Sequence, residues 1–306
     1  MRPMILTCGE AVIDMLPATT GDGRPCFAPA CGGAAVNVAI ALARLGQRAG
    51  FFGGLSTDAF GRLLRDRMAG ERVDLSRAAV TPAPSTLAFV HLTEGSPEFS
   101  FFDEASAGRC LSHADLPALD GVGALVFGGI SLLRTPGAGT FEALMQRAGP
   151  ERLCVLDANV RPALIGTEVE AAYRARLARM MAQADVIKLS DEDFDWLRPG
   201  PPAAFLSGRV ALVLVTHGAG GATAHSRHGA LHLPAPQVTV ADTVGAGDSF
   251  LAAVLALLSD RGQLTPQALA LAPEAVLHDA LAHGIRAASL SVTRPGADPP
   301  TTGEMR

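Results

Sequence analysis

The segment 240–258, VADTVGAGDSFLAAVLALL, places an aspartate between a turn of small residues and a long apolar run. Gly245, Ala246 and Gly247 leave their backbone N–H groups open to a ligand, because no bulky side chain shields them. If a helix begins near Asp248, these groups lie at its positive end, which favours a bound anion. Asp248 could then take a proton from a hydroxyl that attacks a phosphoryl group. A helix N-cap is an equally good interpretation of this aspartate on local physics alone.

Two segments near the N-terminus carry residues suited to a sugar. In CGGAAVNVAIALARLG (31–46), Gly33 permits close approach of a ligand, and Asn37 offers both a donor and an acceptor to hydroxyls. In GEAVIDML (9–16), the carboxylate of Asp14 can accept hydrogen bonds from two neighbouring hydroxyls. Taken singly, each of these residues is also explained as an ordinary turn or first-turn residue.

Charged residues gather in two later segments. In DANVRP (157–162), Arg161 could hold an anionic or polyhydroxylated group. In KLSDEDFDW (188–196), the density of acids could serve Mg²⁺ through water, because Mg²⁺ keeps much of its hydration shell. Acids are also favoured at a solvated helix N-terminus, so both interpretations stay open.

Composition excludes several classes of function. The chain has 306 residues, 48% of them hydrophobic, and a net charge of −5 that argues against a nucleic-acid partner. No basic cluster favours a membrane surface, and no apolar run approaches the roughly 18 residues of a spanning helix. The five cysteines are scattered without a C-x-x-C pair, which predicts a reduced, cytoplasmic protein. Neither a P-loop nor a dinucleotide-binding G-x-G-x-x-G is present.

Short apolar runs that alternate with helical patterns predict the elements. Strands are expected within 121–129, 153–159, 184–190 and 210–218, and a helix is expected from Ala34 to Leu45, before the stop at Gly46. This order predicts an α/β fold with a doubly wound, mainly parallel sheet, whose ligands lie beyond the carboxyl ends of the strands. Polar residues fall at those ends, namely Asp157, Asn159, Lys188, Ser190 and Thr216.

Two segments depart from this alternation. Residues 16–31 are rich in turn residues, and residues 86–102 read as two strands joined by a turn. We predict that both form a small β lid inserted in a single α/β domain spanning 1–306, mainly because of the family resemblance described below. An ordinary surface hairpin is the alternative. We expect the lid to expose apolar residues such as Phe89 or Phe99 on one face.

Taken together, these motifs resemble those of the PfkB/ribokinase-type carbohydrate kinases, and most closely those of the fructokinases. The segments at 31–46 and 240–258 are similar to the two signatures of that family. The intervening blocks occur in the family's order: GEAVIDMLP, FGGISLLRTP, DANVRPAL, ADVIKLSDEDFDWL, VTHGAGG and SVTRPGADPPT. The resemblance covers nearly the whole chain. It implies a three-layer ribokinase-like fold with a β lid, binding of ATP and Mg²⁺, commonly help from a monovalent cation such as K⁺, and a homodimer through the lid.

The resemblance also implies roles for individual residues. Asp248 would be the general base, and the anion hole would comprise Gly245, Ala246 and Gly247. The sugar would contact Asp14, Gly33, Asn37 and Arg161. ATP would contact Lys188, Ser190, Thr216, Gly218, Gly221 and Gly247. Mg²⁺ would be held through water by Asp193 and Glu192, where the family often has Asn-x-x-Glu and this chain has Ser190-x-x-Asp193. The monovalent cation would lie near Asp242, Val244, Ser291, Arg294 and Gly296.

The expected function is therefore an ATP-dependent sugar kinase that transfers the γ-phosphoryl group to a sugar hydroxyl. D-Fructose, giving fructose 6-phosphate, is the first expected acceptor. The acidic sugar 2-keto-3-deoxygluconate is the alternative, because Arg161 would suit its carboxylate, and a purine nucleoside is a third. A protein of a different class, an inactive regulator that binds a sugar or nucleotide on the same scaffold, is disfavoured by the intact turn at 245–248.

Overall fold

The computed structural model describes residues 2–93, 96–198 and 200–306. An eight-stranded sheet forms its centre, in the order β14-β13-β12-β11-β10-β9-β1-β4. These strands are β1 (Met4–Cys8), β4 (Ala49–Phe52), β9 (Val122–Gly128), β10 (Leu153–Asp157), β11 (Val186–Ser190), β12 (Leu212–Thr216), β13 (Ala222–Ser226) and β14 (Gly229–Leu233). Pairing is parallel from β4 to β12, and β13 is antiparallel to both of its neighbours.

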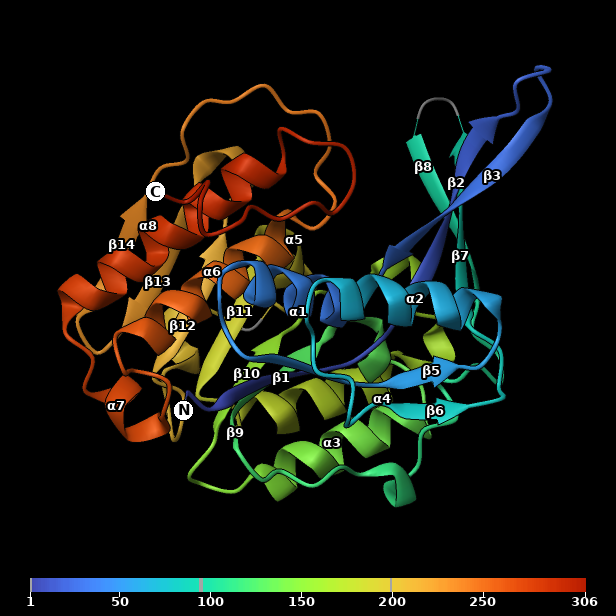
Figure 1. The fold of residues 1–306 in the computed structure, drawn as a ribbon. Helices are drawn as coiled ribbons and strands as arrows, with labels where there is room; N and C mark the ends of the chain where they lie inside the picture. The colour runs from blue at the N-terminus through green and yellow to red at the C-terminus, as the bar shows by residue number, and fades with distance from the viewer. Residues whose placement is uncertain (1, 94–95, 199) are drawn as a thin grey trace.

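Helices cover both faces of this sheet, which gives the three layers that the sequence predicts (Figure 1). One face packs against α3 (Gly137–Ala148), α4 (Thr167–Met181) and α5 (Asp191–Leu197). The other packs against α1 (Ala34–Arg44), α6 (Ala246–Asp260) and α8 (Glu274–Ser291), with the short α7 (Pro266–Ala270). Strand residues alternate between the two cores, so that Leu6 faces the first and Ile5 the second. Strands buried on both faces are mostly apolar, which explains their short hydrophobic runs, and Thr7, Asp157 and Lys188 are the polar exceptions.

Two smaller sheets complete the fold. In the first, β5 (Gly54–Ser56) pairs with β6 (Ala79–Thr81), beside α2 (Ala59–Gly70). The second is the lid, of order β3-β2-β7-β8, which projects from the body at the upper right of Figure 1. Its strands are β2 (Val12–Thr19), β3 (Pro25–Gly32), β7 (Thr86–Thr93) and β8 (Ser96–Phe102).

The lid begins earlier than the predicted range 16–31, because β2 starts at Val12 and β3 ends at Gly32. Asp14 therefore lies within a strand and not in a turn after one. Val12 and Ile13 are buried where the lid joins the body, so this root of the strand has no turn-rich composition to mark it. The strands β7 and β8 occupy the predicted range 86–102. Phe99 lies among the residues whose side chains the structure does not describe.

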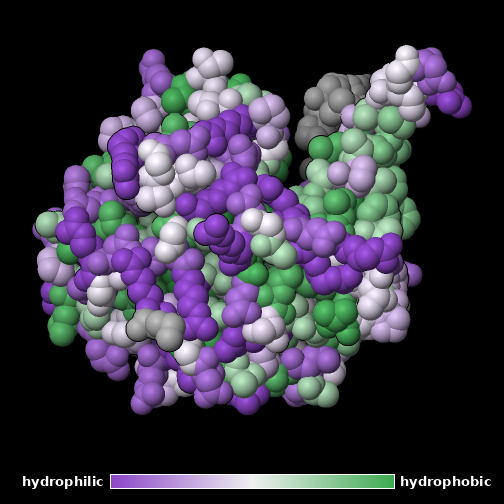
Figure 2. Space-filling view, in the orientation of Figure 1, coloured by the Kyte–Doolittle hydropathy of each residue, from purple (hydrophilic) through white to green (hydrophobic). Residues whose placement is uncertain are grey.

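The lid carries a surface of exposed apolar side chains (Figure 2). Phe102 is 59% exposed, Phe27 is 40% exposed and Leu16 is 39% exposed. The rings of Phe27 and Phe102 both meet the partly buried Phe89 edge to face, with centroids 5.0 and 5.5 Å away. No helix in the described part of the chain is long and apolar enough to span a bilayer.

Candidate active site

The turn at 245–248 opens directly into helix α6. Gly245 precedes the helix in a left-handed conformation, with φ at 74°, and no side chain in the described structure caps this terminus. The helix starts at Ala246, two residues earlier than the sequence suggested, so Asp248 lies in its first turn and is not the N-cap. At this uncapped end the N–H of Ala246 donates to the carbonyl oxygen of Thr243 at 3.3 Å. The N–H groups of Gly247 and Asp248 are the ones that an anion could bind. The N-cap interpretation of Asp248 is therefore excluded.

Close packing requires a glycine at position 245, because a Cβ there would lie 2.8 Å from the Cβ of Ala297 and 3.1 Å from its Cα. A side chain at this position would displace the backbone that presents the N–H groups. A Cβ on Gly247 would lie 3.0 Å from Nζ of Lys188, so a side chain there would press on the end of the lysine side chain and not on backbone.

Asp248 is buried, with 8% of its surface exposed, and it accepts a 2.8 Å hydrogen bond from Nδ2 of Asn37. Burial raises the pKa of its carboxyl group, while the bond from Asn37 and the charges of Lys188 and Arg161 oppose that rise. Asn37 thus holds one carboxylate oxygen in place and leaves the other for a substrate proton. Helices α1 and α6, more than 200 residues apart in the chain, meet at this bond.

The predicted sugar residues Asp14 and Gly33 lie at the base of the lid. Gly33 precedes α1 with φ at 101°, and a Cβ there would come within 2.5 Å of the carbonyl oxygen of Glu10. The side chain of Asp14 is partly buried and makes no hydrogen bond to the residues that the structure describes. Burial raises its pKa to about 6. An unpartnered, partly dehydrated carboxylate is suited to accept hydroxyl hydrogen bonds from a polyol.

The sequence analysis missed Glu10, which joins two parts of the site. Its carboxylate accepts hydrogen bonds from the backbone N–H of Ala34 at 3.1 Å and of Ser131 at 3.3 Å. Burial raises its pKa, and these backbone bonds partly oppose that effect. The only signal in the sequence was its place beside Gly9 in the segment that contains Asp14.

A large cavity of about 780 Å³ extends from Glu10 under the lid, and Phe101, Asp103, Arg109 and Ser131 contribute to its walls. Arg161 is exposed, and its guanidinium donates to the carbonyl oxygen of Val160 at 3.1 Å. Its positive charge acts on the carboxyl of Asp248.

Lys188 and Asp157 form a buried ion pair of 3.0 Å beneath the turn. Burial raises the pKa of Asp157 to about 7, and the charge of Lys188 limits that rise. Burial disfavours the charged form of Lys188, but the neighbouring carboxylates Asp157 and Asp193 outweigh it and raise the pKa of the amine. Lys188 therefore stays cationic next to Gly247, beside the turn that begins α6.

A second cavity, of about 520 Å³, lies on the other side of this turn, against Ala246 and Gly247. The predicted nucleotide residues Thr216, Gly218 and Gly221 line it, and its remaining walls are mostly apolar, including Val240, Phe250, Ile285 and Val292. Gly221 has φ at 97°, and a Cβ there would come within 2.1 Å of the carbonyl oxygen of Leu233. A polar edge beside an apolar slot suits the phosphates and the base of a nucleotide.

The side chain of His217 holds the loop at 217–221 in place through two contacts. The sequence analysis did not predict this role. Its Nδ1 lies 2.7 Å from Oδ1 of Asp191, and its Nε2 lies 2.8 Å from Oγ1 of Thr223. The hydroxyl of Thr223 also meets Nδ1 of His232 at 3.1 Å. These contacts join residues from three elements, so no local pattern could have indicated them.

The predicted Mg²⁺ residues have structural contacts of their own. Ser190 and Asp193 form a capping box at the start of α5. The oxygens of Asp193 accept from the N–H groups of Val160 at 2.6 Å and Ser190 at 2.8 Å. Glu192 is exposed. Across the described ranges no group of three or more His, Cys, Asp or Glu side chains could hold a metal, so an ion here would depend on phosphate oxygens and water.

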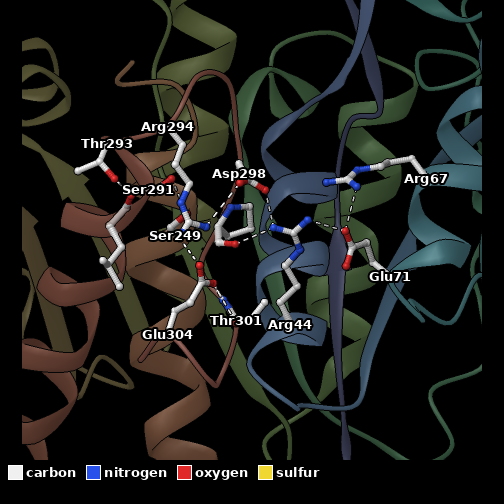
Figure 3. A network of polar contacts seen from close by, with 12 residues as sticks. Arg44, Arg67, Glu71, Ser249, Ser291, Thr293, Arg294, Asp298, Thr301 and Glu304 are labelled. Atoms are coloured by element: carbon white, nitrogen blue, oxygen red, sulfur yellow. Dashed lines mark hydrogen bonds and ion pairs between the residues drawn. The ribbon is translucent and has the colours of Figure 1, made fainter. Parts of the chain in front are cut away.

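The residues predicted for a monovalent cation lie behind the turn at 245–248, near the network of Figure 3. The carboxylate of Asp242 accepts from the N–H of Val244 at 3.0 Å and of Gly296 at 2.8 Å, which joins the two loops. Ser291 is fully buried, and its hydroxyl accepts from Ser249 at 3.2 Å. The side chain of Arg294 turns away, to Asp298 and Glu304. The loops could thus offer backbone carbonyls, hydroxyls and the carboxylate of Asp242 to such an ion.

The site and the fold together define a class of protein. A family model described as "pfkB family carbohydrate kinase" matches residues 2–302. The chain belongs to this family, as the resemblance of its motifs predicted.

Fructokinases are among the similar relatives. A fructokinase of Rhizobium leguminosarum bv. trifolii is 44% identical over 282 residues, which cover 90% of this chain and 86% of that relative. A fructokinase of Klebsiella pneumoniae is 36% identical over 90% of this chain and 91% of its own length.

Solved structures of fructokinases are also similar to this chain. The crystal structure of a fructokinase from Xylella fastidiosa with bound ATP superposes with a TM-score of 0.90 and 30% identity, covering 100% of this chain and 97% of that one. A fructokinase from Vibrio cholerae O395 with bound fructose, ADP and calcium ion superposes with a TM-score of 0.80 and 28% identity, over 97% and 94% of the two chains.

Proposed function

We propose that this protein is an ATP-dependent fructokinase, which transfers the γ-phosphoryl group of ATP to a hydroxyl of D-fructose and forms fructose 6-phosphate. One observation carries the proposal: a buried carboxylate, Asp248, stands in the first turn of an uncapped helix, between a nucleotide-sized cavity and the residues suited to a sugar. Family membership and the fructokinase relatives support the same activity.

In the proposed reaction, Asp248 removes the proton of the sugar hydroxyl as its oxygen attacks the γ-phosphorus. The new oxygen–phosphorus bond forms in line with the breaking bond to the β-phosphate oxygen, and ADP leaves with that bond's electron pair. The N–H groups of the turn and the ammonium of Lys188 stabilise the negative charge on the transferred group. Asn37 keeps Asp248 oriented toward the hydroxyl.

ATP would bind along Thr216, Gly218 and Gly221, with its phosphates directed to Gly247. Mg²⁺, when bound, neutralises charge on the phosphates. We propose that Asp193 and Glu192, aided by Ser190, act on it through water. K⁺ would stabilise the two loops that Asp242 joins, near the backbone of Val244, Ser291, Arg294 and Gly296.

The relatives favour a neutral sugar as the acceptor, because the named relatives are fructokinases. The acids Asp14 and Asp248 would serve such a sugar as hydrogen-bond acceptors for its hydroxyls. The cavity under the lid carries charges of both signs, since Asp103 pairs with Arg109 at 3.4 Å and Arg134 also lines the wall. These charges do not select between D-fructose and a sugar acid such as 2-keto-3-deoxygluconate, so the choice of D-fructose follows from the relatives.

A panel of acceptors tests the proposal. ADP formation is measured with D-fructose, 2-keto-3-deoxygluconate and purine nucleosides, each at equal concentration with MgATP, using Asp248→Asn as the inactive control. Fructose should give the highest kcat/KM. A higher value for the sugar acid or for a nucleoside would overturn the acceptor, and no stimulation by any of them would instead support an inactive sugar- or nucleotide-binding regulator.

We further propose a homodimer that buries the apolar surface of the lid, formed by Leu16, Phe27 and Phe102. A solvated face with several exposed large apolar side chains is typical of an interaction surface. A cytoplasmic location is proposed as well, since Cys8, Cys26, Cys31, Cys110 and Cys154 are free thiols.

A further inference from the structure

Arg44, in the last turn of α1, occupies the centre of a polar network that reaches the C-terminal tail (Figure 3). Its guanidinium donates to Oδ1 of Asp298 at 2.5 Å, to the carbonyl oxygen of Pro299 at 2.7 Å and to Oε1 of Glu71 at 2.7 Å. Its own carbonyl oxygen accepts from the N–H of Thr302 at 3.0 Å. The side chain is only 16% exposed, so water screens these charges weakly.

The loop at 296–298, to which Arg44 is bound through Asp298, packs against the proposed anion hole. The N–H of Asp298 donates to the carbonyl oxygen of Gly296 at 2.9 Å, and the N–H of Gly296 donates to Asp242 at 2.8 Å. Ala297, which lies between Gly296 and Asp298, packs closely on Gly245. A Cβ on Gly245 would lie 2.8 Å from the Cβ of Ala297. A shift of this loop would therefore move the turn that begins α6.

The same helix that carries Arg44 also carries Asn37, which holds Asp248. The two residues are seven positions apart, so they lie on one face of α1, about 10 Å apart along its axis. Helix α1 therefore contacts the start of α6 in two ways, directly through Asn37 and indirectly through Arg44 and the loop at 296–298.

We propose that Arg44 is a positioning residue for phosphoryl transfer. It fixes the 296–298 loop against Gly245 and so sets the position of the anion hole relative to Asp248 and the bound sugar. The proposal rests on the proposed kinase activity. Arg is suited to this role because one planar guanidinium reaches three acceptors that the single ammonium of Lys cannot serve together.

Steady-state kinetics of three variants test this role, with kcat and the KM for fructose determined separately. Arg44→Met and Asp298→Ala should each lower kcat by roughly 10- to 100-fold, the effect expected of a misplacement near 1 Å. The fructose KM should stay within about twofold, because Asp14, Gly33 and Asn37 are left in place. Arg44→Lys should recover part of the lost kcat.

Arg67→Met is the matched control. It breaks the 2.9 Å contact between Arg67 and Glu71 at the outer end of the network and leaves Arg44 bound to Asp298. Its kcat should equal that of the wild type. Asp298 has a side chain that is 41% exposed, so its variant should fold even if Arg44→Met does not.

The outcomes separate the two proposals. If the wild type phosphorylates no sugar, the kinase proposal fails and with it the role of Arg44. If the wild type is active and Asp298→Ala keeps its kcat, the role of Arg44 is overturned while the kinase proposal stands. A rise in fructose KM that matches the loss of kcat would also overturn it, since that result indicates a general distortion of α1.

Discussion

At the scale of single residues, Asp248 decides whether this site can do chemistry. Asp248→Asn keeps the size of the side chain and an oxygen that can accept from Asn37, but it removes the base. We expect kcat to fall by about 10² to 10⁴, the usual contribution of a positioned general base, with little change in the dissociation constant for fructose. ADP release and fructose calorimetry measure the two quantities.

Asp260→Asn is a control with the same substitution at the other end of α6, where Asp260 pairs with Arg2 at the surface. It should leave kcat unchanged. A value for Asp248→Asn within tenfold of the wild type would exclude the proposed role of the carboxylate.

Asp14 makes stability depend on pH. Its pKa is about 6 in the folded protein against 3.8 for the ordinary group, so the folded state holds this proton more tightly than the unfolded chain does. Asp14 therefore lowers the free energy of unfolding as pH rises from about 4 to about 6, by on the order of 3 kcal/mol. Asp14→Asn should raise the Tm at pH 8 and leave it nearly unchanged at pH 4.

Thermal unfolding across this pH range, with and without fructose, is the measurement. Saturating fructose should shrink the difference at pH 8, because its hydroxyls would hydrogen-bond to the ionised carboxylate of the wild type. A variant that is less stable than the wild type at pH 8, or an offset equal at all pH values, would contradict the dehydration of Asp14.

At the scale of elements, the start of α6 depends on a glycine with no room for a side chain. In Gly245→Ala, the alanine must adopt the left-handed conformation of Gly245, and its Cβ clashes with Ala297. Gly262→Ala is the matched control, because Gly262 follows the same helix with φ at 70° and has open space around it. Both variants should lose about 1–2 kcal/mol of stability from the backbone alone.

Only Gly245→Ala should also lose kcat, by roughly tenfold or more, because its clash moves the N–H groups of the anion hole. Denaturant unfolding and initial rates, measured on both variants, separate the two effects. Equal kcat in the two variants would mean that the turn does not position the transferred group.

The sequence predicted the elements better than the contacts between them. Local apolar runs defined the central strands, and Gly46 marked the end of the helix that begins at Ala34, since these features depend on neighbours in the chain. The early start of β2 was missed because the buried root of the lid lacks turn residues. Asp298 could not be linked to Arg44, because 254 residues separate them and only the folded chain brings them together.

In the candidate site, too, local motifs could be predicted from the sequence and contacts between distant segments could not. Asp248, Asn37 and Lys188 were predicted because each belongs to a motif with recognisable spacing, and the structure places them near one another while their roles stay predictions. Glu10 and His217 were missed because their hydrogen-bond partners come from other segments of the chain. Their side chains hold loops in place through those bonds, and no local motif marks that role. The capping box of Ser190 and Asp193 was visible as an acidic helix start, but the bond from Val160 that occupies Asp193 was not.

At the scale of the whole molecule, segments that are far apart in the sequence meet at the start of α6, near the two cavities. The N-terminal lid and α1 carry residues that we propose for the sugar, the strands β11 and β12 lead to residues that we propose for the nucleotide, and α6 begins between them. The C-terminal tail returns to α1 and fixes the loop behind α6. A chain with this arrangement must be folded from end to end before the site exists.

The lid projects from this body with its aromatic side chains exposed, and a second copy of the chain would cover them. Phe102→Asp should convert the proposed dimer to a monomer, because a charge at a position that is 59% exposed in the single chain would be buried unpaired in the interface. Leu271→Asp is the control, since Leu271 is 68% exposed but lies after α7, outside the lid. Light scattering at micromolar concentration measures the mass of each. A monomeric wild type, or a Phe102→Asp variant that stays dimeric, would rule out an interface through this surface.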